Sequence, residues 1–456
     1  MSEGTNSLRI SARLGCSGLL LLAFLASAPP IAAQTVAEVS FKAVELNNRG
    51  LALYKAGKVD DAIALFQQAL EISPDFPEAL GNLGLALDAK GKDRDDEAIA
   101  DFEKALKLKP TDAVTQSNLG LALYHEGKYP ESIAAYETAL ALHSDFPQAV
   151  NGLGAALFAS GQTDDAIAAY RKAVALSPNY VDALNNLAAA LDSKRQWEDA
   201  IPIYREALEL EPHAADVRTN YANALAHAGQ NDHAIAAYRA VLADRPRDAG
   251  VWLLLGHLLY KQARLDDAIA ALQKSLALKP DSADAEFTLA RAFQDQQKLT
   301  EAIAAYQKGL ALKPDDAHAL YNLANAYISV KDTQNAAASF RKALDAQPGF
   351  TEAMLGLGAA LMQSGDLDGA EKEFEDLIAL QPENADARFS LGNALFNKGD
   401  YRRAAESYRE AIRLRADHAH SHYNLAITLQ RLNDNAAAQQ EFKEATRLDP
   451  SLVSPQ

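Results

Sequence analysis

The chain has 456 residues, of which 48% are hydrophobic, and its formal net charge at pH 7 is −17. Nucleic acid and anionic membrane surfaces are disfavoured as partners, because no basic excess exists to neutralise their phosphate groups. Alanine supplies much of the hydrophobic fraction and bulky β-branched residues are sparse. This balance favours helix over sheet, so we expect an all-α protein.

The segment at 1–33 has the order of an export signal. Arg9 and Arg13 precede an apolar run at 19–25, and small residues follow it up to Ala33. The run is shorter than the ~20 residues needed to span a bilayer, and the order of basic, apolar and small residues is typical of a cleaved signal. We expect cleavage after Ala33 and a periplasmic or secreted product without a membrane span. The alternative is an uncleaved N-terminal anchor.

Cysteine chemistry is confined to the same segment. The only cysteine, Cys16, lies within residues 1–33. Residues 34–456 therefore cannot form a disulfide bond or a cysteine-ligated metal site.

A sequence motif of fixed length recurs along the rest of the chain. Its end is marked by Pro74, Pro110, Pro178, Pro212, Pro246, Pro280, Pro314, Pro348, Pro382 and Pro450, with Ser144 and Ala416 at the two remaining positions. Successive marks are equally spaced, except that the first interval is longer by two because the polar turn at 91–96 is extended. A regular period of about 34 residues indicates a repeat protein.

The period predicts a short lead-in at 34–42, twelve repeat units over 43–452 and a tail at 453–456. The units are expected at 43–76, 77–112, 113–146, 147–180, 181–214, 215–248, 249–282, 283–316, 317–350, 351–384, 385–418 and 419–452. We number the places within each unit from its first residue.

Each unit has the pattern of two amphipathic helices. Places 4, 7, 8 and 11 are mostly apolar, and places 20, 24, 27 and 28 repeat this spacing, which predicts a helical hairpin. Place 8 is Gly or Ala in every unit, and place 24 is aromatic in eleven of the twelve. We expect the small residue of the first helix to receive the ring of the second.

The residues of these repeats resemble the tetratricopeptide repeat signature. The match is carried by Gly-Leu-Ala-Leu-Tyr at 50–54 and by Asp-Ala-Ile-Ala-Ala-Tyr at 165–170, which Pro178 follows. The array is similar to the superhelical repeat region of O-linked N-acetylglucosamine transferases, although their catalytic domain is missing. The resemblance implies a right-handed superhelical α-solenoid of helix-turn-helix repeats with a concave groove that binds protein.

The two ends of the array have polar residues where the inner units are apolar. Place 7 is Arg49 in the first unit, and places 21 and 28 of the last unit are Gln439 and Thr446. The end units of a solenoid need such polar faces. We therefore expect a monomer.

Two sets of residues are expected to line the groove. Aromatic residues recur at places 12 and 5: Tyr54, Tyr124, Phe158, Tyr260, Phe396, Phe287, Tyr321, Phe389 and Tyr423. Asparagine occupies place 6 in seven units: Asn48, Asn82, Asn118, Asn186, Asn220, Asn322 and Asn424. In the transferases that the chain resembles, such an asparagine ladder holds the backbone of an extended peptide. The alternatives are that the rings pack on neighbouring helices and that asparagine only satisfies the helix surface.

These features predict a non-enzymatic scaffold that binds an extended peptide or an envelope protein. The alternative is a non-catalytic partner in a glycosyltransferase or polysaccharide-secretion pathway, with the aromatic rings stacked on sugars. No nucleotide-binding loop, nucleophile motif or zinc-protease motif occurs in the sequence, so we expect neither catalysis nor a cofactor. His418 and His422 form a weak candidate metal pair at i, i+4 spacing, although a new helix is expected to begin between them.

Overall fold

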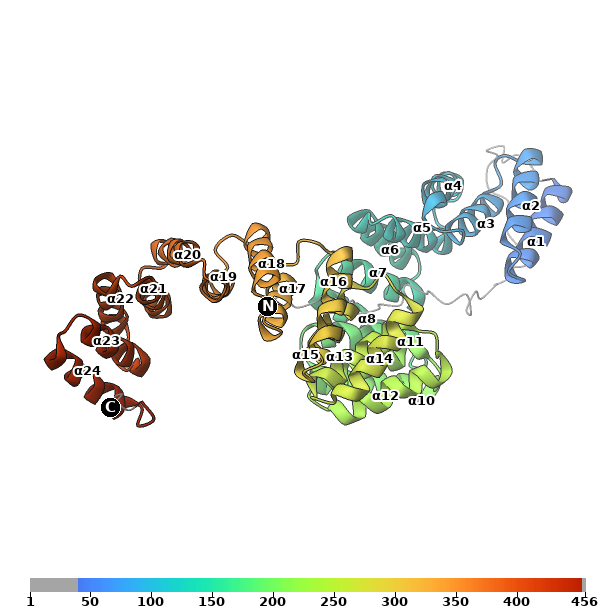
Figure 1. The fold of residues 1–456 in the computed structure, drawn as a ribbon. Coiled ribbons are helices and arrows are strands. Elements are labelled where there is room, and N and C mark those ends of the chain that lie inside the picture. The colour runs from blue at the N-terminus through green and yellow to red at the C-terminus, as the bar shows by residue number, and fades with distance from the viewer. Residues whose placement is uncertain (1–39, 453–456) are drawn as a thin grey trace. The chain divides into compact units, whose positions relative to one another are not determined.

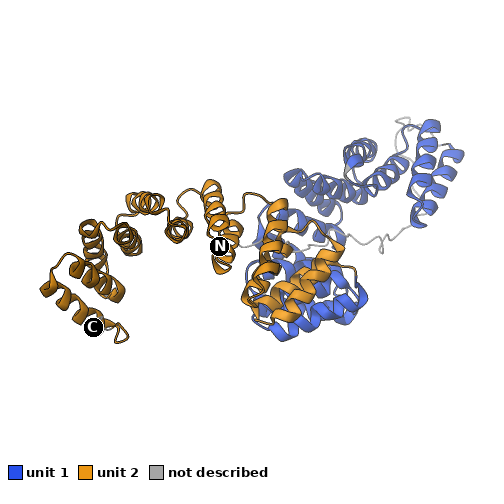
Figure 2. Cartoon of the chain, in the orientation of Figure 1, with its two compact units in different colours: residues 1–246 blue, residues 247–456 orange. Residues whose placement is uncertain are grey.

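The computed structural model describes residues 40–452. The expected export signal at 1–33, most of the lead-in and the tail at 453–456 lie outside the described residues. The chain divides into two compact units, residues 1–246 and 247–456 (Figure 2). From here on, "unit" means one of these two parts, and a single helical hairpin of the array is called a repeat. Their boundary coincides with Pro246, which marks the end of the sixth repeat.

Each unit is built of helices in tandem, and the described residues contain no strand (Figure 1). The first unit comprises α1 (Phe41–Lys55), α2 (Val59–Ile72), α3 (Pro77–Asp88), the 3-10 helix η1 (Lys92–Arg94), α4 (Asp95–Leu108), α5 (Ala113–His125), α6 (Tyr129–Leu142), α7 (Pro147–Ala159), α8 (Thr163–Leu176), α9 (Val181–Ser193), α10 (Trp197–Leu210), α11 (Ala215–His227) and α12 (Asn231–Asp244).

The second unit continues the same alternation. It comprises α13 (Ala249–Lys261), α14 (Leu265–Leu278), α15 (Ala283–Asp295), α16 (Leu299–Leu312), α17 (Ala317–Ser329), α18 (Thr333–Ala346), α19 (Thr351–Ser364), α20 (Leu367–Leu380), α21 (Ala385–Lys398), α22 (Tyr401–Leu414), α23 (Ala419–Arg431) and α24 (Asn435–Leu448). The prediction of an all-α chain of helix-turn-helix repeats is confirmed.

Within each unit, helices pack almost entirely on their neighbours in sequence. The two helices of every hairpin contact each other, and within a unit the second helix of each hairpin contacts the first helix of the next. Such neighbour-to-neighbour packing defines a solenoid, because no element needs a distant partner to bury its apolar face. None of the helices within residues 40–452 is long and apolar enough to cross a bilayer.

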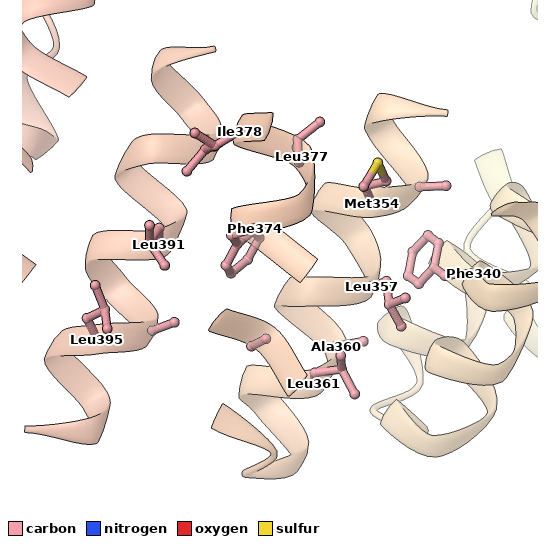
Figure 3. Close-up of a cluster of buried hydrophobic side chains, with 14 of the residues drawn as sticks. Phe340, Met354, Leu357, Ala360, Leu361, Phe374, Leu377, Ile378, Leu391 and Leu395 are labelled. Carbon is pink, nitrogen blue, oxygen red and sulfur yellow. The ribbon is translucent and has the colours of Figure 1, made fainter. Parts of the chain in front are cut away.

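The expected fit between a small residue and a ring is confirmed in the hairpin of α19 and α20. Figure 3 shows Phe374 of this hairpin among buried side chains of the neighbouring helices. Phe374 of α20 is fully buried and lies against Gly358 of α19. A Cβ atom added to Gly358 would lie 2.4 Å from Cε1 of this ring, far inside van der Waals contact. The hairpin of α7 and α8 repeats this arrangement, since a Cβ on Gly154 would lie 2.6 Å from Cε1 of Tyr170.

The turn inside each hairpin requires one residue with left-handed backbone. Gly365 and Gly399 adopt φ of 86° and 83° directly after α19 and α21. Glycine is suited to this conformation because it has no Cβ to clash. Repeats without this glycine still form the turn, as Arg195 shows with φ of 60°.

Candidate functional site

The first helices of successive hairpins form a row within each unit. In the first unit, α1 contacts α3, α5 contacts α7 and α9 contacts α11. Among the described residues, no two second helices approach each other to the same extent. The helices of each unit therefore curve with the first helices of the hairpins on the inner side. We call this series of first helices the inner row.

Asparagine side chains bridge the first helices of neighbouring repeats in the first unit. The Nδ2 group of Asn186 on α9 donates to Oδ1 of Asn151 on α7, at 3.1 Å. The same bond recurs one repeat later, from Asn220 on α11 to Asn185 on α9, at 3.0 Å. Each bond joins place 6 of one repeat to place 5 of the repeat before it.

Two further asparagine bonds join neighbouring first helices. Asn82 on α3 donates to Asn47 on α1 at 2.9 Å, again from place 6 to place 5. In the second unit, Asn424 on α23 donates to Asn393 at place 9 of α21, at 2.8 Å. Asn82, Asn186, Asn220 and Asn424 belong to the predicted asparagine set. The acceptors Asn47, Asn151, Asn185 and Asn393 were missed by sequence reasoning, which considered one place at a time rather than pairs of asparagines in successive repeats.

The amides of α9 retain hydrogen-bonding capacity after these bonds are made. Asn185 and Asn186 are 1% and 0% exposed. Within the described part of the chain, neither Nδ2 of Asn185 nor Oδ1 of Asn186 has a hydrogen-bond partner. Buried polar groups are rarely left unsatisfied in native proteins. Adjacent residues of one helix thus retain an unused donor and an unused acceptor, both buried between the first helices.

The other predicted asparagines are more accessible. Asn48 is exposed, and Asn118 and Asn322 are half-buried. The row is interrupted at Gly152 and Gly356, where a ring of the preceding repeat fills the space. A Cβ on Gly152 would lie 2.4 Å from Cζ of Tyr136, so an asparagine cannot be accommodated there without a shift.

All nine predicted aromatic residues are half-buried, and many contact other rings. At place 5, Tyr321 lies 5.2 Å from Phe350 and Tyr423 lies 5.6 Å from Phe442, measured between ring centroids. At place 12, the ring of Tyr260 carries the guanidinium of Arg291 at 5.2 Å from its centroid. Burial, followed by a hydrogen bond with Asp295, raises the pKa of Tyr260 above its usual range.

The other place 12 rings also lie beside aromatic neighbours. Phe396 is 5.3 Å from Tyr401, and Tyr124 is 5.8 Å from Tyr129. Packing on adjacent helices is therefore one role of these rings. That the remaining surface of these rings, and of Tyr54, Phe158, Phe287 and Phe389, lines the groove stays a prediction.

The two histidines predicted as a weak metal pair, His418 and His422, form hydrogen bonds with different protein groups. His422 Nδ1 lies 2.6 Å from Glu441 Oε2, and its Nε2 lies 3.2 Å from the carbonyl oxygen of Ala416. His418 precedes the first residue of α23, and its Nδ1 bonds the hydroxyl of Ser421. Because both ring nitrogens of His422 have protein partners, the structure does not join it with His418 as a pair of metal ligands.

Sequence models of the tetratricopeptide repeat match nearly the whole helical array. One of them covers residues 117–181, 287–350, 355–419 and 391–453, which together make up half of the chain. Others cover 50–91, 77–112, 169–201, 193–258 and 249–282. The chain belongs to the tetratricopeptide repeat family, whose repeats form protein-interaction scaffolds.

Several solved structures are similar to this chain. The Cut9–Hcn1 assembly of the APC/C is 14% identical, covers 90% of this chain and 94% of its own, and has a TM-score of 0.40. Yeast Tom70 is 16% identical, with coverage of 90% and 98% and a TM-score of 0.36. MamA is 30% identical over 36% of this chain and 96% of its own, with a TM-score of 0.35. No curated protein matches the sequence.

Proposed function

We propose that the protein is a non-catalytic scaffold that binds an extended peptide segment of a partner protein along the inner row of its first unit. The observation that carries this proposal is the row of asparagines along the first helices, in which buried pairs join α7, α9 and α11 while Asn48 is exposed and Asn118 is half-buried. An extended peptide displays N–H and C=O groups that these accessible amides can bind.

The amide pairs suit this role because each bond fixes the orientation of two side chains. The bonds from Asn186 to Asn151 and from Asn220 to Asn185 hold α7, α9 and α11 in a fixed register, and so fix the spacing of the row. A surface whose polar groups are already oriented binds with a smaller entropic cost than one that must be ordered.

Peptide is favoured over glycan by the state of the aromatic rings. Sugar stacking needs an open ring face, whereas in the first unit Tyr124 lies 5.8 Å from Tyr129, and in the second unit Tyr321 lies 5.2 Å from Phe350, between ring centroids. Half-buried rings beside oriented amides can instead cover apolar side chains of a peptide at low entropic cost. A glycan array probed with the purified protein tests the sugar alternative.

The expected export signal gives the proposed compartment. If residues 1–33 direct export, the partner is a periplasmic, envelope or extracellular protein. Fractionation of cells expressing the full chain tests this point, and mass spectrometry of the N-terminus reports whether cleavage follows Ala33.

The binding proposal is tested by crosslinking and affinity purification of the protein from its native cells, followed by mass spectrometry. We expect crosslinks to residues of the first helices α5, α7 and α9, and we expect Asn118→Ala to weaken capture of the same partner, because Asn118 is half-buried and belongs to the predicted row. Asn179→Ala is the matched control, because Asn179 is exposed in the loop that precedes α9. Equal capture by both variants, with native circular dichroism, contradicts the proposal.

A further inference from the structure

Three potential metal ligands converge where the second and third repeats meet. Asp88 is the last residue of α3, Asp95 is the first residue of α4, and His125 is the last residue of α5. One carboxylate oxygen from each aspartate and one ring nitrogen of the histidine lie within 4.8 Å of one another. His125 Nδ1 is 2.9 Å from Asp88 Oδ1.

The cluster is shielded from solvent on one side and open on the other. Asp95 is 1% exposed, and the side chain of Asp88 is 8% exposed. The side chain of His125 is 30% exposed, so an ion can enter along the imidazole. Two carboxylates held close together and away from water repel each other unless a cation lies between them.

A second Asp–His pair in the same register shows what the third residue adds. Asp192 on α9 and His227 on α11 lie 3.1 Å apart, as the equivalents of Asp88 and His125. The second helix there begins with Trp197, whose ring is 6.3 Å from that of His227. The Asp–His pair is therefore a recurring link between repeats, and Asp95 is the feature peculiar to the second repeat.

The longer turn of the second repeat explains why a carboxylate, that of Asp95, lies at the start of its second helix. Other second helices begin with residues such as Val59, Tyr129 and Leu265. In the second repeat the extended turn contains η1, and α4 starts at Asp95. The place where other repeats present an uncharged side chain is thus occupied by a buried aspartate.

We propose that Asp88, Asp95 and His125 bind one divalent first-row transition metal ion of the Zn²⁺ type. One imidazole and two carboxylates form a donor set suited to such ions, with solvent completing the coordination. Ligands of a tetrahedral zinc ion lie about 3 to 3.5 Å apart, so the observed spread needs only a small contraction. The ion would join α3, α4 and α5, and thereby tie the second repeat to the third.

The hydrogen bond with Asp88 raises the pKa of His125, against the opposing effect of burial, and the charge of Asp95 adds to the rise. A metal ion bound to the imidazole competes with protons, so the metal affinity should rise with pH.

The test is calorimetric titration of the purified, chelator-treated full chain with ZnCl₂, for the native protein, Asp95→Asn and Asp192→Asn. Even loss of an outer partner of a metal ligand costs 10- to 100-fold in affinity, so Asp95→Asn should weaken binding by more than about 100-fold. Asp192→Asn, at the pair that lacks the third carboxylate, should leave the affinity unchanged. Circular dichroism verifies that both variants are folded.

A second readout separates binding from folding. Zn²⁺ should raise the Tm of the native protein and of Asp192→Asn but not that of Asp95→Asn, because only a ligand of the native state stabilises it. Absence of zinc binding, equal affinity of Asp95→Asn and the native protein, or equal losses in both variants overturns the proposal.

Discussion

The packing of Phe374 on Gly358 provides a double-mutant test of the repeat architecture. Phe374 is fully buried, and Phe→Ala substitutions in protein cores cost about 3–5 kcal/mol through lost transfer energy and the remaining cavity. Gly358 has no side chain that could move into this cavity. We therefore expect Phe374→Ala to lie in the upper part of that range.

The effect of Gly358→Ala on the free energy of unfolding should have opposite signs in the native chain and in the Phe374→Ala variant. In the native chain the new Cβ would lie 2.4 Å from the ring, and overpacking of this kind costs about 1–3 kcal/mol. Better helix propensity offsets about 0.5–1 kcal/mol of this cost. Five repeats have Ala at place 8, so the backbone can adjust, and we expect a net loss of about 0.5–1.5 kcal/mol.

In the Phe374→Ala background the same methyl group enters the cavity, so Gly358→Ala should stabilise by about 0.5–1 kcal/mol or more. Urea unfolding followed by circular dichroism gives the four free energies, and hydrogen exchange of α19 and α20 localises the effect. Leu380→Ala is the control, because Leu380 is 56% exposed and should change stability by less than about 0.5 kcal/mol. The same effect of Gly358→Ala in both backgrounds would refute the packing of the ring on this glycine.

Three further outcomes follow from the structure. Asn151→Ala should cost about 1–3 kcal/mol, because Nδ2 of buried Asn186 loses its acceptor, and Asn151→Ala with Asn186→Ala should cost less than the sum of the single changes in urea unfolding. The raised pKa of His125 means that its pairing with Asp88 stabilises the fold fully below about pH 6.5 and less as pH rises through the folded-state pKa. In chelator, His125→Gln should therefore lower the Tm more at about pH 5.5 than at about pH 8.5, and an equal loss at both would contradict this. Ser132→Ala should destabilise the third repeat by about 1 kcal/mol in the same unfolding assay, because the buried hydroxyl donates to the carbonyl of Gly120 at 2.6 Å.

The sequence predicts the helical hairpins well because their packing is local. Every first helix from α3 onward begins at the first residue of an expected repeat, and the pairing of Gly358 with Phe374 follows from spacing within one hairpin. Contacts of this kind recur once in every repeat, so a pattern in one dimension is sufficient to find them.

Features that depend on how successive repeats are placed were harder to predict. The acceptors Asn151 and Asn185 became evident only when adjacent first helices were seen side by side, with place 5 next to place 6 of the following repeat. The repeat spacing shows only that the turn at 91–96 is longer by two residues, whereas the structure shows that this turn brings Asp95 to Asp88 and His125. The division of the chain into two compact units after Pro246 could not be predicted from the repeat spacing, because the repeats on both sides of Pro246 have the regular length.

The central claim, that the amides of the first unit bind a peptide backbone, is tested most directly by N-methylation of a bound peptide. A peptide selected on the purified protein would be synthesised with one backbone nitrogen methylated at a time, and its affinity for the native chain and for Asn118→Ala measured. Loss of a hydrogen bond of about 1–3 kcal/mol predicts a drop of roughly 5- to 150-fold at one or two positions for the native chain. The same methylations should have little further effect on Asn118→Ala. Uniform tolerance of methylation by the native chain, or equal sensitivity in the variant, would contradict recognition of the backbone by these amides.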